Sequence, residues 1–351
     1  MVKRLFNACL LRPGDVQPSQ TDLEVVGTFN PGAVAVGDEV VLLVRVAERP
    51  RERRPGFTAL PRWDGDSGLV VDWVPDHELY VIDQRVVRYK QDGTVRLTFI
   101  SHLLTVCSTN GRSVASVDGV RFGPEVEYEE YGVEDPRITR IVDTFYFTYV
   151  AVSRHGAATA LASTNNFQTF TRHGIIFYPE NKDVVLFPEQ IDGAYVALHR
   201  PHPATRFTAP EMWLAWSSDL VHWGQHEPLR TQVALWARGR TGAGTPPIRT
   251  SEGWLEVYHG NDKGADVPGI GTYAAGALLL DFQQPHRLLG QSIGAVLTPE
   301  TDFEREGFVP NVVFPTGIVE RGETLLLYYG AADTAVGVVE VSRAELLAAV
   351  R

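Results

Sequence analysis

The sequence is poor in cysteine and has no long hydrophobic run. Its 351 residues include only two cysteines, Cys9 and Cys107, and neither lies in a CxxC or Cys/His spacing. Two cysteines cannot form a disulfide framework, and their surroundings exclude the common cysteine-ligated metal sites. No segment approaches the ~18 consecutive apolar residues of a membrane-spanning helix, so the chain is not expected to cross a membrane.

Positive charge is also scarce. Lys and Arg number 32 against 43 Asp and Glu, which gives a net charge of −11. Such a chain is repelled by nucleic-acid phosphates and by anionic lipid, so neither is an expected partner. The N-terminal segment MVKRLFNACLLRPGD is a poor signal peptide, because Arg12 and Pro13 end its short apolar stretch. We therefore expect a soluble, cytoplasmic protein.

Several catalytic motifs are missing. There is no Walker A loop, no GxGxxG after a strand and no GxSxG nucleophile motif. The carboxylates are not clustered with the histidines, so no metal site is predicted. The glycine-rich segment GAGTPP (242–247) is flanked by proline and is interpreted as a tight loop near a ligand.

Helical periodicity is scarce, whereas short strands recur. A Gly- or Asp-bearing turn followed by β-branched and aromatic residues occurs at 37–48, 142–153, 192–201, 251–260 and 321–330. Five units in 351 residues give about 70 residues each, the size of a four-stranded propeller blade with generous loops. We predict an all-β fold, a five-bladed β-propeller. A pair of β-sandwiches or a β-helix with long loops is the alternative.

No linker divides the chain, so a single domain over 1–351 is predicted, with a short lead-in at 1–24 and a C-terminal helix at about 342–351. The basic, proline-rich segment 49–65 is expected to be an exposed loop. The five recurring strands are expected to be the first of their blades and to line a central channel. Polar residues at their ends are therefore candidates for chemistry.

The densest polar cluster is YEEYGVEDPRITR (128–140), which contains four carboxylates: Glu129, Glu130, Glu134 and Asp135. Pro136 keeps Asp135 out of the helical region of backbone conformation. A carboxylate held rigidly at a strand suits general acid catalysis, which needs accurate placement first. A solvated acidic turn is the alternative interpretation.

Polar residues occur at comparable places in all five units, at Arg45, Asp135, Arg200, His259 and Asp333. Each alone is more often part of a salt bridge or a surface, but repeat geometry would bring all five to one mouth of the channel. Arg45, Lys182, Arg200 and His259 would then form a cationic site, since guanidinium groups match phosphate or carboxylate oxygens.

Longer segments resemble the glycoside hydrolase family 130 phosphorylases. They extend from about residue 25 to 345 and read FNPGAVAVGDEVVLLVRVAE, GVEDPRITRI, ENKDVVLFPE, ALHRPHP, DLVHWG, GAGTPP, YHG, FVPNVVFP and LLLYYGAADTAVG. That family has a five-bladed β-propeller, in agreement with the five units. Its members cleave β-mannosides with inversion, using inorganic phosphate as the nucleophile and releasing α-mannose 1-phosphate.

The resemblance implies a role for each matching residue. Asp135 of the EDPR motif is the expected general acid, acting through the 3-hydroxyl of the mannosyl ring. The expected phosphate ligands are Lys182, Arg200, His259 and Tyr273, with Lys182 near the phosphate or the mannosyl ring. The expected contacts to substrate are Asn30, Arg45, Arg137 and Asp333. Phosphate is a co-substrate, and no cofactor or metal is implied.

Some questions remain open from the sequence. A β-mannoside hydrolase of the same family and a non-catalytic carbohydrate-binding propeller are the alternative functions, although retention of the basic set favours a phosphorylase. The ENKD and YGAADT segments resemble the branch that acts on mannooligosaccharides and mannosyl-N-acetylglucosamine more than the mannosyl-glucose branch. The linkage (β-1,4, β-1,2 or other) and the acceptor sugar (mannose, glucose or N-acetylglucosamine) are not determined. The expected partners are an oligosaccharide and phosphate. The short N-terminal extension leaves room for a dimer or another small homo-oligomer.

Overall fold

The structure, a computed structural model, describes residues 1–203, 205, 207–263 and 270–351. The chain is all-β, and the α-helices within these ranges are the short α1 (Asp302–Arg305) and α2 (Arg343–Ala349). In the part of the chain that is described, no helix is long and apolar enough to cross a membrane.

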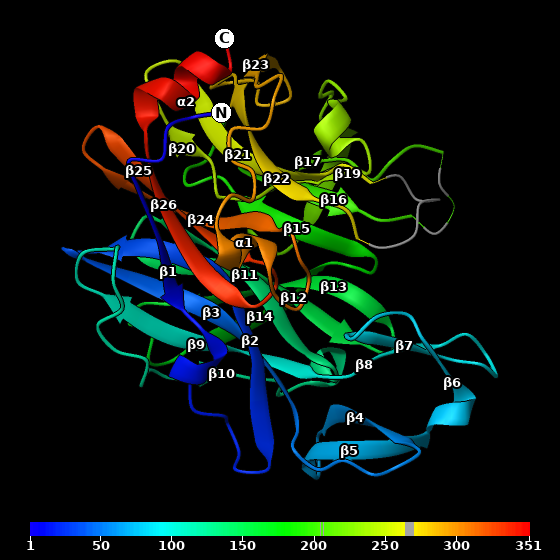
Figure 1. The fold of residues 1–351 in the computed structure, drawn as a ribbon. Helices are drawn as coiled ribbons and strands as arrows, with labels where there is room; N and C mark the ends of the chain where they lie inside the picture. Colours follow the sequence, from blue (N-terminus) through cyan, green and yellow to red (C-terminus); the bar gives the residue numbers. More distant parts are fainter. Residues whose placement is uncertain (204, 206, 264–269) are drawn as a thin grey trace.

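The strands of the described residues form four larger sheets and two small ones (Figure 1). The eight-stranded sheet comprises β2 (Leu23–Val36), β3 (Glu39–Pro50), β9 (Ile100–Ser108), β10 (Arg121–Phe122), β11 (Gly132–Ile141), β12 (Thr144–Ser153), β13 (Gly156–Thr164) and β14 (Thr171–Phe177). A four-stranded sheet comprises β15 (Asn181–Leu186), β16 (Tyr195–Pro201), β17 (Trp213–Ser217) and β18 (Trp223–Pro228).

The C-terminal half supplies the other two larger sheets. One comprises β19 (Arg240–Gly242), β20 (Ile248–Arg249), β21 (Trp254–Asn261), β22 (Tyr273–Leu280) and β23 (Leu288–Gln291). The other comprises β24 (Val313–Arg321), β25 (Thr324–Ala331), β26 (Ala335–Ser342) and the N-terminal β1 (Phe6–Leu11). The expected lead-in therefore contains a strand, and β1 beside β26 joins the two ends of the chain (Figure 1).

The sheets pack face to face, and this packing explains the long apolar strands. In β25, Leu325 and Leu327 belong to a core cluster with Leu255 of β21. The alternate residues Leu326 and Tyr328 belong to a second cluster, shared with β3 and β9. Because successive side chains point to opposite faces, a strand between two sheets must be apolar at nearly every position.

The five predicted strands are present as β3, β12, β16, β21 and β25, but the expectation that each begins its unit is wrong. Each pairs antiparallel with a strand that precedes it in the chain: β2, β11, β15, β20 and β24, respectively. Most of these preceding strands are interrupted by prolines and by shifts in register, so their alternation is weak. The α2 helix lies where it was expected and is capped by Ser342, whose side chain accepts a hydrogen bond from the Glu345 amide.

An insertion between β3 and β9 forms a separate projecting lobe (Figure 1). It contains β4 (Phe57–Asp64) paired with β5 (Gly68–Pro75), and β6 (Leu79–Val81), β7 (Val86–Tyr89) and β8 (Val95–Leu97) in a small sheet. The prediction of a loop over 49–65 is therefore only partly right. Residues 51–56 are exposed, but 57–64 form a strand whose partner lies outside the segment.

Candidate active site

Side chains from several sheets line one cavity of about 440 Å³, within the usual size range of small-molecule sites. The basic lining residues are Arg45, Arg85, Lys182, Arg200, Arg240 and Lys263. The acidic ones are Glu134, Asp135, Asp183 and Asp333. Seven of the nine sequence-predicted site residues line this cavity, namely Asn30, Arg45, Asp135, Lys182, Arg200, Tyr273 and Asp333.

Three polar residues of the cavity lie at irregularities of the strands that carry them. The register shifts between Phe29 and Gly32 in β2, between Glu134 and Arg137 in β11, and between Lys182 and Val185 in β15. Asn30, Asp135 and Asp183 lie within these shifts and have φ of 47°, 50° and 56°. Asn and Asp tolerate this left-handed conformation better than other side chains. The bulges redirect these side chains.

Asp135 is held by a dense set of donors. Its Oδ1 accepts hydrogen bonds from Asn30 Nδ2 at 2.8 Å and from Arg45 Nη1 at 2.9 Å. Arg45 also donates to Glu134 at 2.6 Å and stacks on Phe29. Burial favours the neutral acid, but the charges of Arg45 and Arg137 outweigh it and hold the pKa of Asp135 below its usual value.

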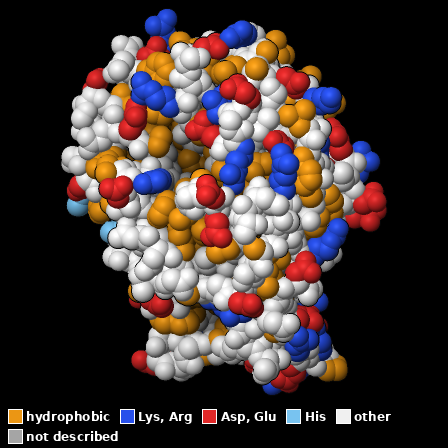
Figure 2. Space-filling view, turned by 90° about the vertical axis from the view of Figure 1, so that its left-hand side faces the viewer, with side chains coloured by type: hydrophobic (Ala, Val, Ile, Leu, Met, Phe, Trp, Pro, Cys, Tyr) orange, Lys and Arg blue, Asp and Glu red, His pale blue; other side chains and the backbone are white. Residues whose placement is uncertain are grey.

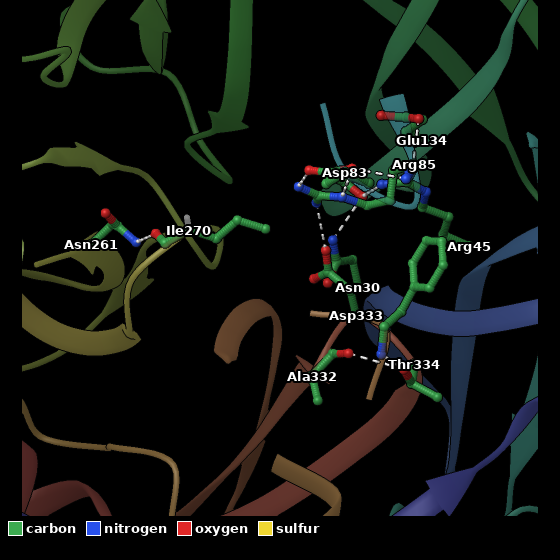
Figure 3. A network of polar contacts seen from close by, with 12 residues as sticks. Asn30, Arg45, Asp83, Arg85, Glu134, Asn261, Ile270, Ala332, Asp333 and Thr334 are labelled. Carbon is green, nitrogen blue, oxygen red and sulfur yellow. Dashed lines mark hydrogen bonds and ion pairs between the residues drawn. The ribbon is translucent and has the colours of Figure 1, made fainter. Parts of the chain in front are cut away.

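Asp333 forms the neighbouring wall together with an arginine from the projecting lobe. Arg85 Nη1 donates to Asp333 Oδ2 at 3.0 Å, while its Nη2 donates to Asp83 at 2.9 Å. Figure 3 shows Arg85, Arg45, Asn30 and Asp333 gathered on one side of the site, opposite Asn261. Burial raises the pKa of Asp333 above its usual value, although Arg85 and Arg45 oppose the shift.

A second wall of the cavity, supplied by β15 and β16, is cationic. Arg200 is 5% exposed, and its Nε donates to Asp183 Oδ2 at 2.7 Å, but its buried Nη1 has no partner among the described residues. Lys182 pairs with Arg200 across β15 and β16, so both side chains lie on the same face. On the outer face seen in Figure 2, acidic and basic side chains are interspersed without a large patch of one sign.

Asp183 organises the residues behind this wall. Its carboxylate lies 2.7 Å from Arg200 Nε, 3.3 Å from Arg137 Nη2 and 3.3 Å from His259 Nε2. Burial opposes ionisation, but Arg200, His259 and Arg137 together hold the pKa of Asp183 well below its usual value. Asp183 therefore remains a carboxylate that fixes the orientation of its partners.

Arg137 and His259 differ from the other predicted site residues, because neither lines the cavity. Arg137 is 1% exposed and donates to the Asp135 carbonyl oxygen at 2.7 Å. His259 is fully buried and packs on Phe314, with ring centroids 4.1 Å apart. Desolvation lowers the pKa of His259, and this effect outweighs the attraction of Asp183. Direct contact with substrate or phosphate, as the sequence predicted for these two, is not what this arrangement favours.

Comparison with known proteins identifies the family. Residues 72–351 match a glycoside hydrolase family 130 model described as β-1,4-mannooligosaccharide phosphorylase. The chain belongs to glycoside hydrolase family 130. It is 36% identical over 344 residues to a β-1,2-mannobiose phosphorylase of Listeria innocua, covering 96% of this chain and 95% of that protein. It is 34% identical over 214 residues to a β-1,4-mannooligosaccharide phosphorylase of Ruminococcus albus, covering 60% and 63% of the two chains.

A solved structure extends the likeness to the whole fold. The Listeria innocua β-1,2-mannobiose phosphorylase in complex with β-1,2-mannobiose superposes with a TM-score of 0.90, covering 97% of this chain and 96% of that one. This family 130 chain thus shares both its sequence motifs and its fold with that phosphorylase. Within the described residues, no group of His, Cys, Asp and Glu is arranged to hold a metal ion.

Sequence reasoning missed Asp183 and Arg85. Asp183 lies in the quoted motif ENKD, but only Lys182 of that motif was singled out. The available signal was an acidic residue directly before the apolar run VVLF. Arg85 carries no such signal, because its role depends on how the lobe folds over Asp333. Arg240 and Lys263, which also line the cavity, were not predicted either.

Proposed function

We propose that this chain catalyses the phosphorolysis of β-mannosides with inversion, yielding α-mannose 1-phosphate. The observation that carries the proposal is that one cavity contains a rigidly held carboxyl, Asp135, and an unsatisfied cationic wall around Arg200. A hydrolase needs a second carboxylate to activate water, and the other carboxylates of the cavity, Glu134, Asp183 and Asp333, are each paired with an arginine. A phosphorylase needs a site for the phosphate anion, and the cationic wall favours it.

The proposed reaction is a single displacement. A phosphate oxygen bonds to C1 of the mannosyl group as the bond from C1 to the glycosidic oxygen breaks. The leaving oxygen takes a proton that originates on Asp135 and passes through the 3-hydroxyl of the mannosyl ring. Phosphate is already an anion, so no general base is required.

The charge state of Asp135 links the two substrates in this proposal. Its carboxyl is ionised in the free site because Arg45 and Arg137 lie close to it. A bound phosphate places negative charge nearby, and a nearby like charge raises the pKa of a carboxyl. Phosphate binding therefore helps Asp135 to acquire the proton that it later donates.

We assign the other residues by their position. Lys182 and Arg200 are the phosphate ligands, with Tyr273 beside them, and Arg240 and Lys263 add positive charge to the same cavity. Asn30, Arg45 and Asp333 face the mannosyl group. Arg137 and His259 are assigned a supporting role, because Arg137 holds the Asp135 backbone and both side chains contact Asp183.

We further propose a β-1,2-linked substrate, such as β-1,2-mannobiose or a short β-1,2-mannooligosaccharide. The Listeria innocua enzyme named for β-1,2-mannobiose aligns with 96% of this chain, whereas the Ruminococcus albus enzyme named for β-1,4-mannooligosaccharides aligns with 60%. The matched family region begins at residue 72. It therefore leaves out β4, the first strand of the lobe that supplies Arg85.

The strand order supports a single domain over 1–351 built as a five-bladed propeller. The proposed blades are β2-β3-β9-β10, β11 to β14, β15 to β18, β19 to β23, and β24-β25-β26 completed by β1. The first two blades share one sheet through a single parallel pair, Gly132 with Ser101. Pairing of β1 with β26 would close the ring.

The test is incubation of the protein with β-1,2-mannobiose or β-1,4-mannobiose, with and without inorganic phosphate. We expect mannose 1-phosphate to appear only with phosphate, in the α configuration by proton NMR, and fastest from the β-1,2-linked disaccharide. Release of free mannose at an equal rate without phosphate would establish a hydrolase instead. No turnover with any mannoside would leave a carbohydrate-binding protein.

A further inference from the structure

Glu256 of β21 is a buried carboxyl without a role in the mechanism above. It is fully buried, and its Oε1 accepts a single hydrogen bond, 2.9 Å from the Gly244 amide nitrogen. Its Oε2 is buried and has no partner among the described residues. An ionised carboxylate in such a place would be poorly solvated, so the neutral acid is the form that this geometry favours.

The backbone of Gly244 connects Glu256 with the active site. Its amide donates to Glu256, and its carbonyl oxygen lies 3.4 Å from Arg137 Nε. A side chain at this position would clash, because a Cβ would lie 2.3 Å from the Val257 carbonyl oxygen. The peptide is therefore held closely between β21 and Arg137.

Arg137 in turn contacts the backbone of Asp135, the residue that carries the catalytic carboxyl. Its Nη1 donates to the Asp135 carbonyl oxygen at 2.7 Å, and its Nη2 lies 3.3 Å from Asp183 Oδ1. This guanidinium therefore contacts both the left-handed backbone of Asp135 and the carboxylate of Asp183. A new negative charge on Glu256 would compete with these two partners for Arg137.

We propose that Glu256 is a positioning residue whose protonated side chain fixes the Gly244 peptide and leaves Arg137 to hold Asp135 and Asp183, and that loss of this proton limits activity at alkaline pH. The proposal rests on the proposed phosphorolysis for its kinetic readout. The charged or titratable groups that act on Glu256 are Arg137, from β11, and Tyr258, on its own strand. Burial raises the pKa of Glu256 to about 8, consistent with this geometry.

The decisive variant is Glu256→Gln, because glutamine keeps the shape of the neutral acid and cannot ionise. We expect near wild-type kcat/KM for the mannoside at pH 7 with saturating phosphate. In the wild type, kcat/KM falls about tenfold per pH unit above pH 8. In the variant, kcat/KM stays constant until another group titrates. Circular dichroism at pH 9 checks that the wild type is still folded. An alkaline loss that is the same in both proteins would overturn the proposal.

A stability readout does not depend on any activity. A carboxyl with a raised pKa in the folded state contributes stability that is lost as pH rises from about 4.3 towards that pKa. The difference in unfolding midpoint between wild type and Glu256→Gln should therefore change between pH 5 and about 8 and level off above. A difference in unfolding midpoint that does not change with pH would disprove titration of Glu256. Failure of the proposed function would leave the kinetic assay without a signal but would not affect this stability measurement. If the variant does not fold, infrared titration of the wild type must still show a protonated carboxyl at pH 7.

Discussion

The two walls of the cavity differ in whether their cationic side chains are already paired. On the wall around Asp135, the cationic groups are already satisfied: Arg45 contacts Glu134 and Asp135, and Arg85 contacts Asp83 and Asp333. On the wall around Arg200, both Arg200 and Arg240 keep a buried side-chain nitrogen without a partner among the described residues.

This difference indicates what each wall is built to do. A wall whose charges are already paired is held in place before any ligand arrives, as general acid catalysis requires. A wall with unsatisfied donors is completed by an anion. Changes to the paired wall should therefore act on kcat or on the KM for mannoside, and changes to the open wall should act on the demand for phosphate.

The largest effect should come from the paired wall, with Asp135→Asn. Asparagine keeps the shape of the side chain but has no acidic proton to transfer, so kcat should fall by roughly 10²–10⁴-fold. Mannoside binding, measured by calorimetry, should change much less. The exposed Asp143→Asn is the matched control, since the Asp143 side chain is 90% exposed. Near wild-type kcat in Asp135→Asn would assign the acid to another carboxyl, such as Asp333 or Glu134.

Asp183→Asn tests the support behind the open wall. Removing one partner of a buried ion-pair network costs about 3–5 kcal/mol, and here it leaves Arg137 and Arg200 uncompensated. The folded-state pKa of Asp183 is depressed, so its contribution is present above the unfolded pKa of about 3.9 and is lost as pH falls below it. Urea unfolding should show the full loss at pH 7 and a smaller one at about pH 2.5, well below the unfolded pKa. Equal losses at both pH values would contradict the depressed pKa.

Arg200→Ala tests the open wall itself. Loss of a charge-assisted hydrogen bond costs about 1.5–3 kcal/mol, so the KM for phosphate should rise roughly 10- to 100-fold while that for mannoside stays near the wild-type value. The comparison variant is Arg249→Ala, because Arg249 is an exposed arginine that pairs with Glu189. If Arg200 only braces Asp183, its variant will lose thermal stability while the phosphate dependence remains unchanged.

These contrasts also show which parts of the molecule a sequence reveals. The recurring strands were predictable because a strand buried on both faces is apolar throughout, as β25 is. The strands that precede them were not, since β2, β11 and β15 carry register shifts. Those same irregularities carry Asn30, Asp135 and Asp183, so the features that obscure the strands create the site.

Site residues were predictable where one local motif was enough. Asp135 stands in EDPR and Arg200 lies near the end of a buried strand, so each is conspicuous along the chain. The role of Asp183 arises from contacts with Arg137, Arg200 and His259, which lie on three other strands. Such convergence becomes visible only in three dimensions.

Arg85→Ala should give the smallest effect and would sharpen the contrast between a folded core and its added lobe. The Arg85 and Asp333 side chains are 26% and 18% exposed, and their contact is one charged hydrogen bond, so its loss costs about 1–2 kcal/mol. Asp333 would lose the donor that holds its carboxylate in place, so it would be a less well-oriented acceptor for the sugar. We expect the KM for mannoside to rise about 5- to 20-fold and phosphate dependence to stay the same. Arg88→Ala, an exposed position on β7, the strand that begins directly after Arg85, should change neither constant. An unchanged KM for mannoside in Arg85→Ala would mean that the lobe covers the cavity without taking part in substrate recognition.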